Sequence, residues 1–412
     1  MDANESSTTP TETTSTIAFT PTTSEASSAA TYSSQPPPPP SAVMSGPIPV
    51  TTLSVSSWRT EYPRIGQFAM TASEEVVAAG PSGLIYFRRL RDHESTPWSE
   101  PRPLPDIPAI LNDSSVSGLA VHFYERSEKQ RLDVYCVSGG VLYNFYRIDG
   151  TGSPFAVHPR PPFSTYRVSG TPAATTHPYD WRVPQRWSLV VPCQSGGLLH
   201  TSIAYSSTTG LTSPGYRYSS EKDWEKVDHV ATELGVISAA SITTNCTQGD
   251  EYGNKCIRII AACVAGARLH VLEGQFAMES GYSSMFTWRA QASTRVNHPG
   301  EVTGNPVLIT EEGKGQLDLL APSTEGGIFH FVRTASAPDE WHMIARITFF
   351  QGLPMTSCLA VTRTPTKYGQ AIYFRALVQS GGQLYQVKTY ESANPWSGSY
   401  LKPIVTPGPF AD

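Results

Sequence analysis

Apolar and polar residues alternate on both sides of a glycine pair in the stretch VSGGVLYNFY, residues 137–146. Nearly the same pattern returns in QSGGLLHTSI at 194–203 and in QSGGQLYQVK at 379–388. Two adjacent glycines readily adopt the positive φ angles that a tight hairpin turn needs, and alternating runs suit paired strands that bury one face. The pattern therefore predicts β-hairpins at these places.

The hairpin pattern occurs six times along the chain, at intervals of 55 to 70 residues. Aligned on the turn, the copies read GLIYF (83–87), GVLYN (140–144), GLLHT (197–201), ARLHV (267–271), GIFHF (327–331) and GQLYQ (382–386). The fourth residue of each copy is a tyrosine or a histidine: Tyr86, Tyr143, His200, His270, His330 and Tyr385. A repeat of this period indicates a fold built from similar units.

Each copy has the same internal plan. A strand of small residues comes first, as in 117–124, 237–244 and 357–363, and two strands flank the glycine turn. A fourth strand opens with an aromatic residue: Trp98, Phe155, Trp224, Trp288, Trp341 or Trp396. Four antiparallel strands repeated six times predict an all-β fold, a six-bladed β-propeller over residues 58–412. The 32 glycines and 35 prolines argue against a helical alternative.

Residues 1–57 differ in composition from the rest of the chain. They are rich in Ser, Thr and Pro, carry almost no charge and include a proline run from Pro36 to Pro40. Such a segment buries too little apolar surface to offset its ordering entropy, so we expect a disordered tail, with a ligand for a proline-binding domain as the alternative. Its first residues lack the features of a secretory signal, so a cytoplasmic location is expected.

The composition excludes several kinds of partner. The 412 residues are 39% hydrophobic and carry a net charge of -5, which does not favour nucleic acid or an anionic membrane. No apolar run is long enough to span a bilayer. The six cysteines are widely spread without zinc-site spacing, so we expect no metal; a Cys246–Cys256 disulfide is left open. The oligomeric state is also left open, with a homodimer as one option.

The stretch 117-SGLAVHFYERSEKQRLDVYCVSGGVLYNF-145 resembles one blade of the fungal fucose-specific lectins, which are six-bladed propellers. The resemblance implies sugar sites between blades, each made of an arginine on the second strand, a glutamate on the third strand and an aromatic residue of the neighbouring blade. Asp133, Val190 and Asp318 occupy the arginine position in three copies. Arg375 fits this position, and Arg258 fits it with a shift of two residues, which keeps the same strand face.

The position of the lectin glutamate contains no acid in this chain. The alignment places there Phe87, Asn144, Thr201, Val271, Phe331 and Gln386. We therefore expect the fucose sites to be lost in at least five blades, while Arg375 with Gln386 could still hold a sugar.

Two functional hypotheses follow from this pattern. The favoured one is a cofactor-free enzyme that resembles the hetero-Diels–Alderases of fungal tropolone-sesquiterpenoid biosynthesis, which would need an apolar pocket and a few hydrogen-bond donors. It assigns catalysis to Arg375, Arg258, His330, His270 and His200, and binding of an apolar small-molecule substrate to Phe87, Phe331, Gln386, Tyr385, Trp181 and Trp396. The alternative is a divergent lectin that binds fucose or another glycan; a protein-binding scaffold is a third option.

Overall fold

The computed structural model describes most of the chain after residue 49, in segments. These are residues 50–55, 65–89, 98–104, 107–126, 129–148, 154–158, 162–177, 186–204, 226–247, 256–278, 284–288, 294–310, 315–337, 340–349, 355–365, 372–388 and 400–403. The chain divides into two units, Met1–Pro47 and Ile48–Asp412. Everything below concerns the second unit.

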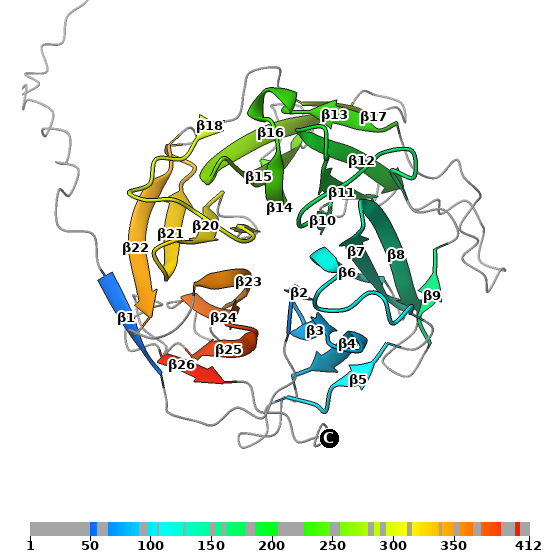
Figure 1. The fold of residues 1–412 in the computed structure, drawn as a ribbon. Coiled ribbons are helices and arrows are strands. Elements are labelled where there is room, and N and C mark those ends of the chain that lie inside the picture. The colour runs from blue at the N-terminus through cyan, green and yellow to red at the C-terminus, as the bar shows by residue number, and fades with distance from the viewer. Residues whose placement is uncertain are drawn as a thin grey trace, which may run out of the picture. The chain divides into compact units, whose positions relative to one another are not determined.

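Six antiparallel sheets form a ring in this unit, which confirms the predicted propeller (Figure 1). Blade one contains β2 (Phe68–Met70), β3 (Glu75–Gly80), β4 (Gly83–Arg88) and β5 (Arg102–Pro103). Blade two contains β6 (Val116–Arg126), β7 (Lys129–Ser138), β8 (Val141–Ile148) and β9 (Ala156–Val157). Blade three contains β10 (Ala173–Thr176), β11 (Arg186–Pro192), β12 (Leu198–Ala204) and β13 (Asp228–Val230).

The remaining three blades complete the ring. Blade four contains β14 (Ile237–Thr247), β15 (Cys256–Ala265), β16 (Arg268–Met278) and β17 (Ser284–Trp288), with β18 (Thr294–Arg295) also pairing with β16. Blade five contains β19 (Val307–Thr310), β20 (Leu317–Pro322), β21 (Ile328–Arg333) and β22 (His342–Phe349). Blade six contains β23 (Thr356–Pro365), β24 (Ile372–Ser380), β25 (Gln383–Lys388) and β26 (Tyr400–Pro403).

Blades with long and short inner strands alternate around the ring. The inner strands β6, β14 and β23 have 11, 11 and 10 residues, whereas β2, β10 and β19 have 3, 4 and 4. Each long inner strand carries a register shift near its start. We call blades two, four and six the long blades, and blades one, three and five the short blades. The repeating unit of this ring is therefore a pair of blades.

The turn between the second and third strands also differs between blades; in blade one it consists of Pro81 and Ser82, because Gly80 pairs with Gly83. In the long blades it has two residues, both at positive φ: Gly139–Gly140, Gly266–Ala267 and Gly381–Gly382. Positive φ at both positions defines a type I′ turn, whose twist matches that of the flanking strands. In blades three and five the strands are instead joined by five residues, because Pro192 pairs with Leu198 and Pro322 with Ile328.

Strand β1 (Val50–Val55) lies inside the segment that we predicted as a disordered tail. It pairs in parallel with β22 of blade five and with β26 of blade six, at the outer edge of the ring (Figure 1). Residues 50–55 therefore form a strand within the segment predicted as a tail, and the boundary at residue 57 stays a prediction. The sequence VTTLSV is rich in β-branched residues and adds a strand to two otherwise open sheet edges. The rest of the predicted tail lies outside the described residues.

The hydrophobic core lies between neighbouring blades. One cluster, for example, joins Val76 and Phe87 of blade one to Leu377 and Leu384 of blade six. Cys136, Cys193, Cys263 and Cys358 are buried free thiols. The register pairs Cys246 with Ile257 and Thr247 with Cys256, so the two cysteines of the disulfide left open above are not register partners.

Helical structure in the described segments is limited to the short 3-10 helix Thr232–Leu234. Among these residues no helix is long and apolar enough to cross a membrane.

Candidate functional site

The length of the turn and the position of its glycines decide how the alignment assigns the two faces of each third strand. In the long blades Asn144, Val271 and Gln386 face the next blade, as the lectin alignment expects. In the short blades the alignment is out of phase by one residue, because Phe87 packs against blade six and Phe331 against blade four. Successive strand residues point to opposite faces, so Tyr86, His200 and His330 take the position towards the following blade.

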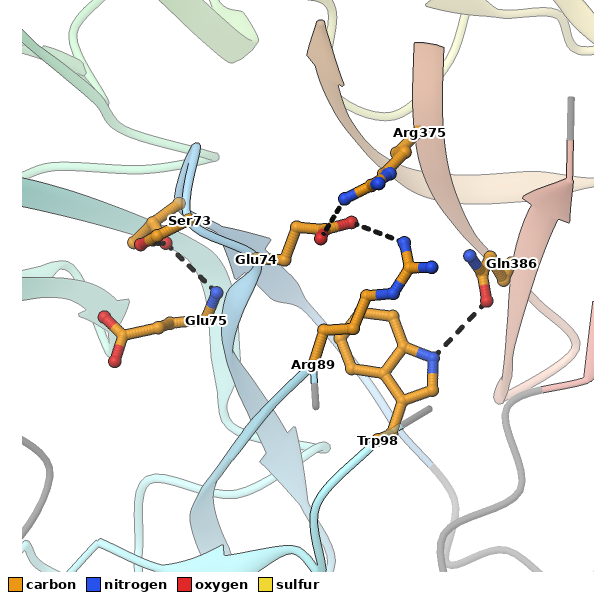
Figure 2. Close-up of polar contacts among 8 residues, drawn as sticks. Ser73, Glu74, Glu75, Arg89, Trp98, Arg375 and Gln386 are labelled. Carbon is orange, nitrogen blue, oxygen red and sulfur yellow. Dashed lines mark hydrogen bonds and ion pairs between the residues drawn. The ribbon is translucent and has the colours of Figure 1, made fainter. Parts of the chain in front are cut away.

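An ion-pair cluster lies between blades six and one (Figure 2). Glu74, in the turn between β2 and β3, accepts hydrogen bonds from Arg375 of β24 through Oε2 and from Arg89 through Oε1, the latter at 3.1 Å. The side chains of Arg375 and Arg89 are 29% and 23% exposed, whereas Glu74 is 8% exposed. Both arginines therefore reach the solvent, with one carboxylate held between them.

Trp98 and Gln386 complete this cluster. Trp98 Nε1 donates to Gln386 Oε1 at 3.4 Å, and the indole packs edge-on against Phe87 with ring centroids 5.7 Å apart. Trp98 is buried, with 1% of its surface exposed, and its indole N–H positions the Gln386 amide. Glu74 has a φ of 62°, a left-handed conformation that is unfavourable for a residue with a side chain. Such strain is typical of functional positions, where surrounding contacts maintain it.

A related cluster lies between blades four and five. Glu273 of β16 accepts a hydrogen bond from Arg333 of β21, and the Arg333 guanidinium lies 5.2 Å from the centroid of the Trp341 ring. Arg258 lies on the same face of β15, two residues from Ile260, the register partner of Glu273. This interface therefore has the three components of a lectin site: an arginine on the second strand, a glutamate on the third and an aromatic residue of the next blade.

The sequence alignment missed Glu273 and Glu74 for different reasons. Glu273 lies two residues beyond Val271 on the same strand face, which is the shift that Arg258 already showed on the neighbouring strand. Applying this shift to both strands would have found it. Glu74 comes from a turn of the next blade, and no spacing within one repeat indicates such a contact.

The interface between blades two and three is closed. Arg131 donates to both oxygens of Asp133 at 2.5 Å, and its guanidinium lies 4.7 Å from the centroid of the Tyr146 ring. The side chains of Arg131 and Asp133 are 6% and 0% exposed. His122 nearby bonds Thr176 Oγ1 at 2.6 Å, and burial lowers its pKa to about 4.

The three interfaces from a short blade to the following long blade are also filled by the protein's own polar groups. Between blades one and two, Glu75 accepts from Tyr86 at 2.5 Å and from Arg147 at 3.2 Å. Burial and the bond to Glu75 raise the pKa of Tyr86 to about 12. Between blades five and six, Asp318 accepts from His330 at 2.9 Å and from Arg363 at 3.1 Å.

Between blades three and four, Ser188 is the centre of a buried hydrogen-bond network. Its Oγ lies 2.9 Å from His177 Nε2 and 3.1 Å from His200 Nε2. Burial lowers the pKa of His177 to about 3 and also lowers the pKa of His200, which Asp228 partly opposes. His200 packs edge-on against Trp288 of blade four.

The residues proposed from the sequence are thus dispersed. Arg375 and Gln386 meet at one interface, whereas Arg258 lies at another, and His200 and His330 are buried at two more. Tyr385 packs towards blade five, and His270 pairs with Cys263 in β15 and is half-buried. Trp181 and Trp396 lie outside the described residues. Within the described part of the chain no group of three His, Cys, Asp or Glu side chains could hold a metal ion.

Comparisons with solved structures place the fold among the propeller lectins of fungi. A fucoside complex of the Aleuria aurantia lectin matches with a TM-score of 0.53 and 13% identity, covering 85% of this chain and 99% of that one. Another Aleuria aurantia structure, described as a six-bladed β-propeller with a novel mode of fucose recognition, matches with a TM-score of 0.51 and 12% identity, over 85% and 97% of the two chains.

The AofleA protein of Arthrobotrys oligospora matches with a TM-score of 0.51 and 11% identity, over 84% of this chain and 88% of that one. No protein-family model and no curated protein sequence matches the chain. At these identities the likeness establishes the fold: the chain is a six-bladed propeller of the architecture that fungal fucose-specific lectins share.

Proposed function

We propose that this protein is a carbohydrate-binding propeller, a lectin with sites between each of two long blades and the short blade that follows. The observation that carries the proposal is the cluster between blades six and one, where Arg375, Gln386 and Trp98 meet (Figure 2). An arginine, a third-strand side chain and an aromatic residue of the next blade are the components that the lectin resemblance implies.

The chemistry of this cluster suits a sugar. A guanidinium and a carboxamide donate hydrogen bonds in fixed planes, which selects the spacing of oxygens on a pyranose ring. The acid that the third strand lacks comes from Glu74 of the next blade, and about a quarter of each arginine side chain is exposed to an incoming ligand. The site between blades four and five offers Arg258, Glu273 and Trp341 in the corresponding places.

The cycloaddition hypothesis has less support. It places Phe87 and Phe331 in an apolar pocket, but these side chains are 2% and 0% exposed and fill the interfaces between blades. His200 and His330, its candidate proton carriers, are 2% and 1% exposed and are engaged with Ser188 and Asp318. None of these groups offers surface to an apolar substrate, whereas Arg375 and Arg89 do offer surface to a polar one.

A glycan array followed by calorimetry on the full chain tests the proposal. We expect binding to one class of saccharide with two sites per chain. Arg375→Ala and Arg258→Ala should each remove one site, and the double variant should remove both. Arg102→Ala, a change of the same kind at an exposed strand end, should bind normally. A folded protein that binds no saccharide, or a double variant that binds like wild type, would contradict the proposal.

A further inference from the structure

We propose that the ligand of these two sites is an anionic saccharide, one that carries a carboxylate or a sulfate group. The inference rests on the proposed function and specifies its substrate class. It follows from the charge and the hydrogen-bonding groups of the two clusters, which differ from those of the closed interfaces.

Among the described residues, the site between blades six and one contains two arginines and one acid. Two arginines, Arg89 and Arg375, share the single carboxylate of Glu74, and each of them binds a different oxygen. A carboxylate whose oxygens are both engaged by guanidinium groups is a poor acceptor for ligand hydroxyls. A guanidinium, in contrast, carries five N–H donors, of which one carboxylate oxygen engages at most two.

The side-chain amide of Gln386 adds a further hydrogen-bond donor to those of the two arginines. Gln386 Oε1, the acceptor of that side chain, receives the Trp98 indole N–H at 3.4 Å. The other part of the amide is its NH₂ group, which only donates; the Gln386 residue as a whole is 4% exposed. A neutral sugar hydroxyl gains most where a donor and an acceptor are both offered, whereas a carboxylate or sulfate needs donors alone. This site therefore favours an acceptor-only, negatively charged group.

The site between blades four and five also has two arginines and one acid among the described residues, but its acid comes from a different element. Arg258 and Arg333 stand beside the single carboxylate of Glu273, which comes from the long blade and not from a turn of the short one. Two N–H groups at this interface, Arg258 Nε and Trp341 Nε1, are buried and have no hydrogen-bond partner among the described residues. Buried donors without an acceptor are costly, and an anionic ligand oxygen would satisfy them.

The short blades supply the second arginine of both sites through one local sequence. Phe87 and Arg88 end β4 and Arg89 follows it, whereas Phe331-Val332-Arg333 ends β21; each phenylalanine is buried against the preceding long blade. Because of the strand alternation, the arginine two residues later points to the same face. Blade three has Thr201 and Ile203 in these places, and the interface that it forms with blade two is the closed one.

The closed interface shows the contrasting arrangement. There one arginine, Arg131, binds both oxygens of one acid, Asp133, and both side chains are almost completely buried. This pair leaves no net charge. Among the described residues, two arginines thus accompany one acid at these two interfaces; the cluster at Glu74 reaches the solvent through both arginines, while Arg333 is 9% and Glu273 17% exposed.

The inference is tested by comparing methyl glycosides that differ in charge. Calorimetry on the full chain would measure glucuronide against glucoside, 6-sulfogalactoside against galactoside, and α-L-fucoside as a second neutral sugar. We expect the anionic member of a pair to bind at least about tenfold more tightly, since one added ion pair of about 1.4 kcal/mol gives that factor. The preference should weaken between about 0.05 M and about 0.5 M salt, because exposed charges are screened.

The outcomes separate the two proposals. A preference for the glucuronide alone identifies a carboxylate, one for the sulfated sugar alone identifies a sulfate ester, and either supports the inference. Equal or tighter binding of the neutral sugars overturns the inference while the protein remains a lectin. If no sugar of either kind binds, on this panel or on the array, the proposed function itself fails.

A pair of variants tests the assigned residues. The double variant Arg89→Gln/Arg333→Gln should lose the preference for anionic sugars by at least about tenfold. The double variant Arg89→Lys/Arg333→Lys keeps both positive charges and should retain most of the preference for anionic sugars. It therefore distinguishes the loss of charge from a general loss of structure. Arg102→Gln is the matched control for removing one exposed positive charge. An unchanged preference in the folded glutamine variant overturns the assignment.

Discussion

The interface between blades five and six and the interface between blades six and one each hold one carboxylate between two basic side chains, but they expose these groups differently. Asp318, His330 and Arg363 have side chains that are 1%, 1% and 8% exposed. Glu74 is almost as buried, yet its partners Arg375 and Arg89 are 29% and 23% exposed. The same chemistry is therefore closed in one place and open to the solvent in the next.

The difference shows what each cluster can do. The charged groups of a closed cluster lose their hydration when the protein folds, and their pairing contributes to the specificity with which two blades pack. An open cluster gains little stability because water and salt screen its charges. Its arginines can instead exchange contacts with a ligand. Exposure of the basic partners, more than the presence of an ion pair, separates the cluster at Glu74 from structural contacts.

The largest expected effect is on stability at the closed interface. Asp318→Ala removes the carboxylate that the buried Arg363 and His330 share, so we expect a loss of about 3–5 kcal/mol in the free energy of unfolding. Glu74→Ala should cost about 1 kcal/mol or less, because its arginines can turn to water. Urea denaturation of the two variants measures the difference. Equal losses for the two substitutions would contradict the comparison.

The closed interfaces should also make stability depend on pH. Burial lowers the pKa of His122 to about 4, while in the unfolded chain it is about 6.5, so between these values the unfolded state binds a proton that the folded state does not. Stability is therefore complete above about pH 6.5 and falls as the pH drops towards 4. At about 1.4 kcal/mol per pKa unit, this histidine accounts for about 3 kcal/mol.

The variant His122→Gln isolates this contribution. Its unfolding free energy should fall less than that of wild type between neutral pH and pH 4, as measured by denaturation at a series of pH values. His177, whose pKa burial lowers to about 3, would continue to act in the variant. A slope unaffected by His122→Gln would mean that the interface between blades two and three opens to water.

The smallest expected effect concerns the backbone of the open site. Glu74 has a φ of 62°, which glycine adopts freely and alanine does not. Glu74→Gly and Glu74→Ala remove the same carboxylate, so their difference reports the backbone alone. We expect the glycine variant to be more stable than the alanine variant by about 1 kcal/mol. If alanine is equally stable, the turn holds no strain at this residue.

The sequence was sufficient for the number of blades and for the order of strands in each, because both depend on a short local signal, the glycine turn between alternating apolar runs. The sequence was not sufficient to predict which face of each third strand points to the following blade. The five-residue turn of blade five leaves β21 out of phase by one residue, which exchanged Phe331 with His330 in the candidate pockets. In blade one the turn has two residues and Gly83 follows it instead of lying in it, so the alignment on this glycine exchanged Phe87 with Tyr86.

The alignment of the repeats also could not predict contacts between different blades. Glu74 reaches Arg375 from another blade, and β1 joins the edges of two blades that are distant from it in sequence. Neither contact has a periodic signal within one copy. Arg375 was found because it occupies a position that the lectin pattern defines, and its partner was missed because the pattern has no acid in that turn.

The pairing of long and short blades has a consequence for how such a ring can change during evolution or in the laboratory. A single blade cannot be deleted or duplicated without placing two blades of one kind side by side, where their inner strands and turn lengths no longer match. A pair can be moved as a module, since its two outer faces meet the same neighbours as before. We expect recombination to preserve the order of this ring when it exchanges two blades at a time, and a symmetric propeller built from three copies of one pair to be the simplest design that this architecture permits.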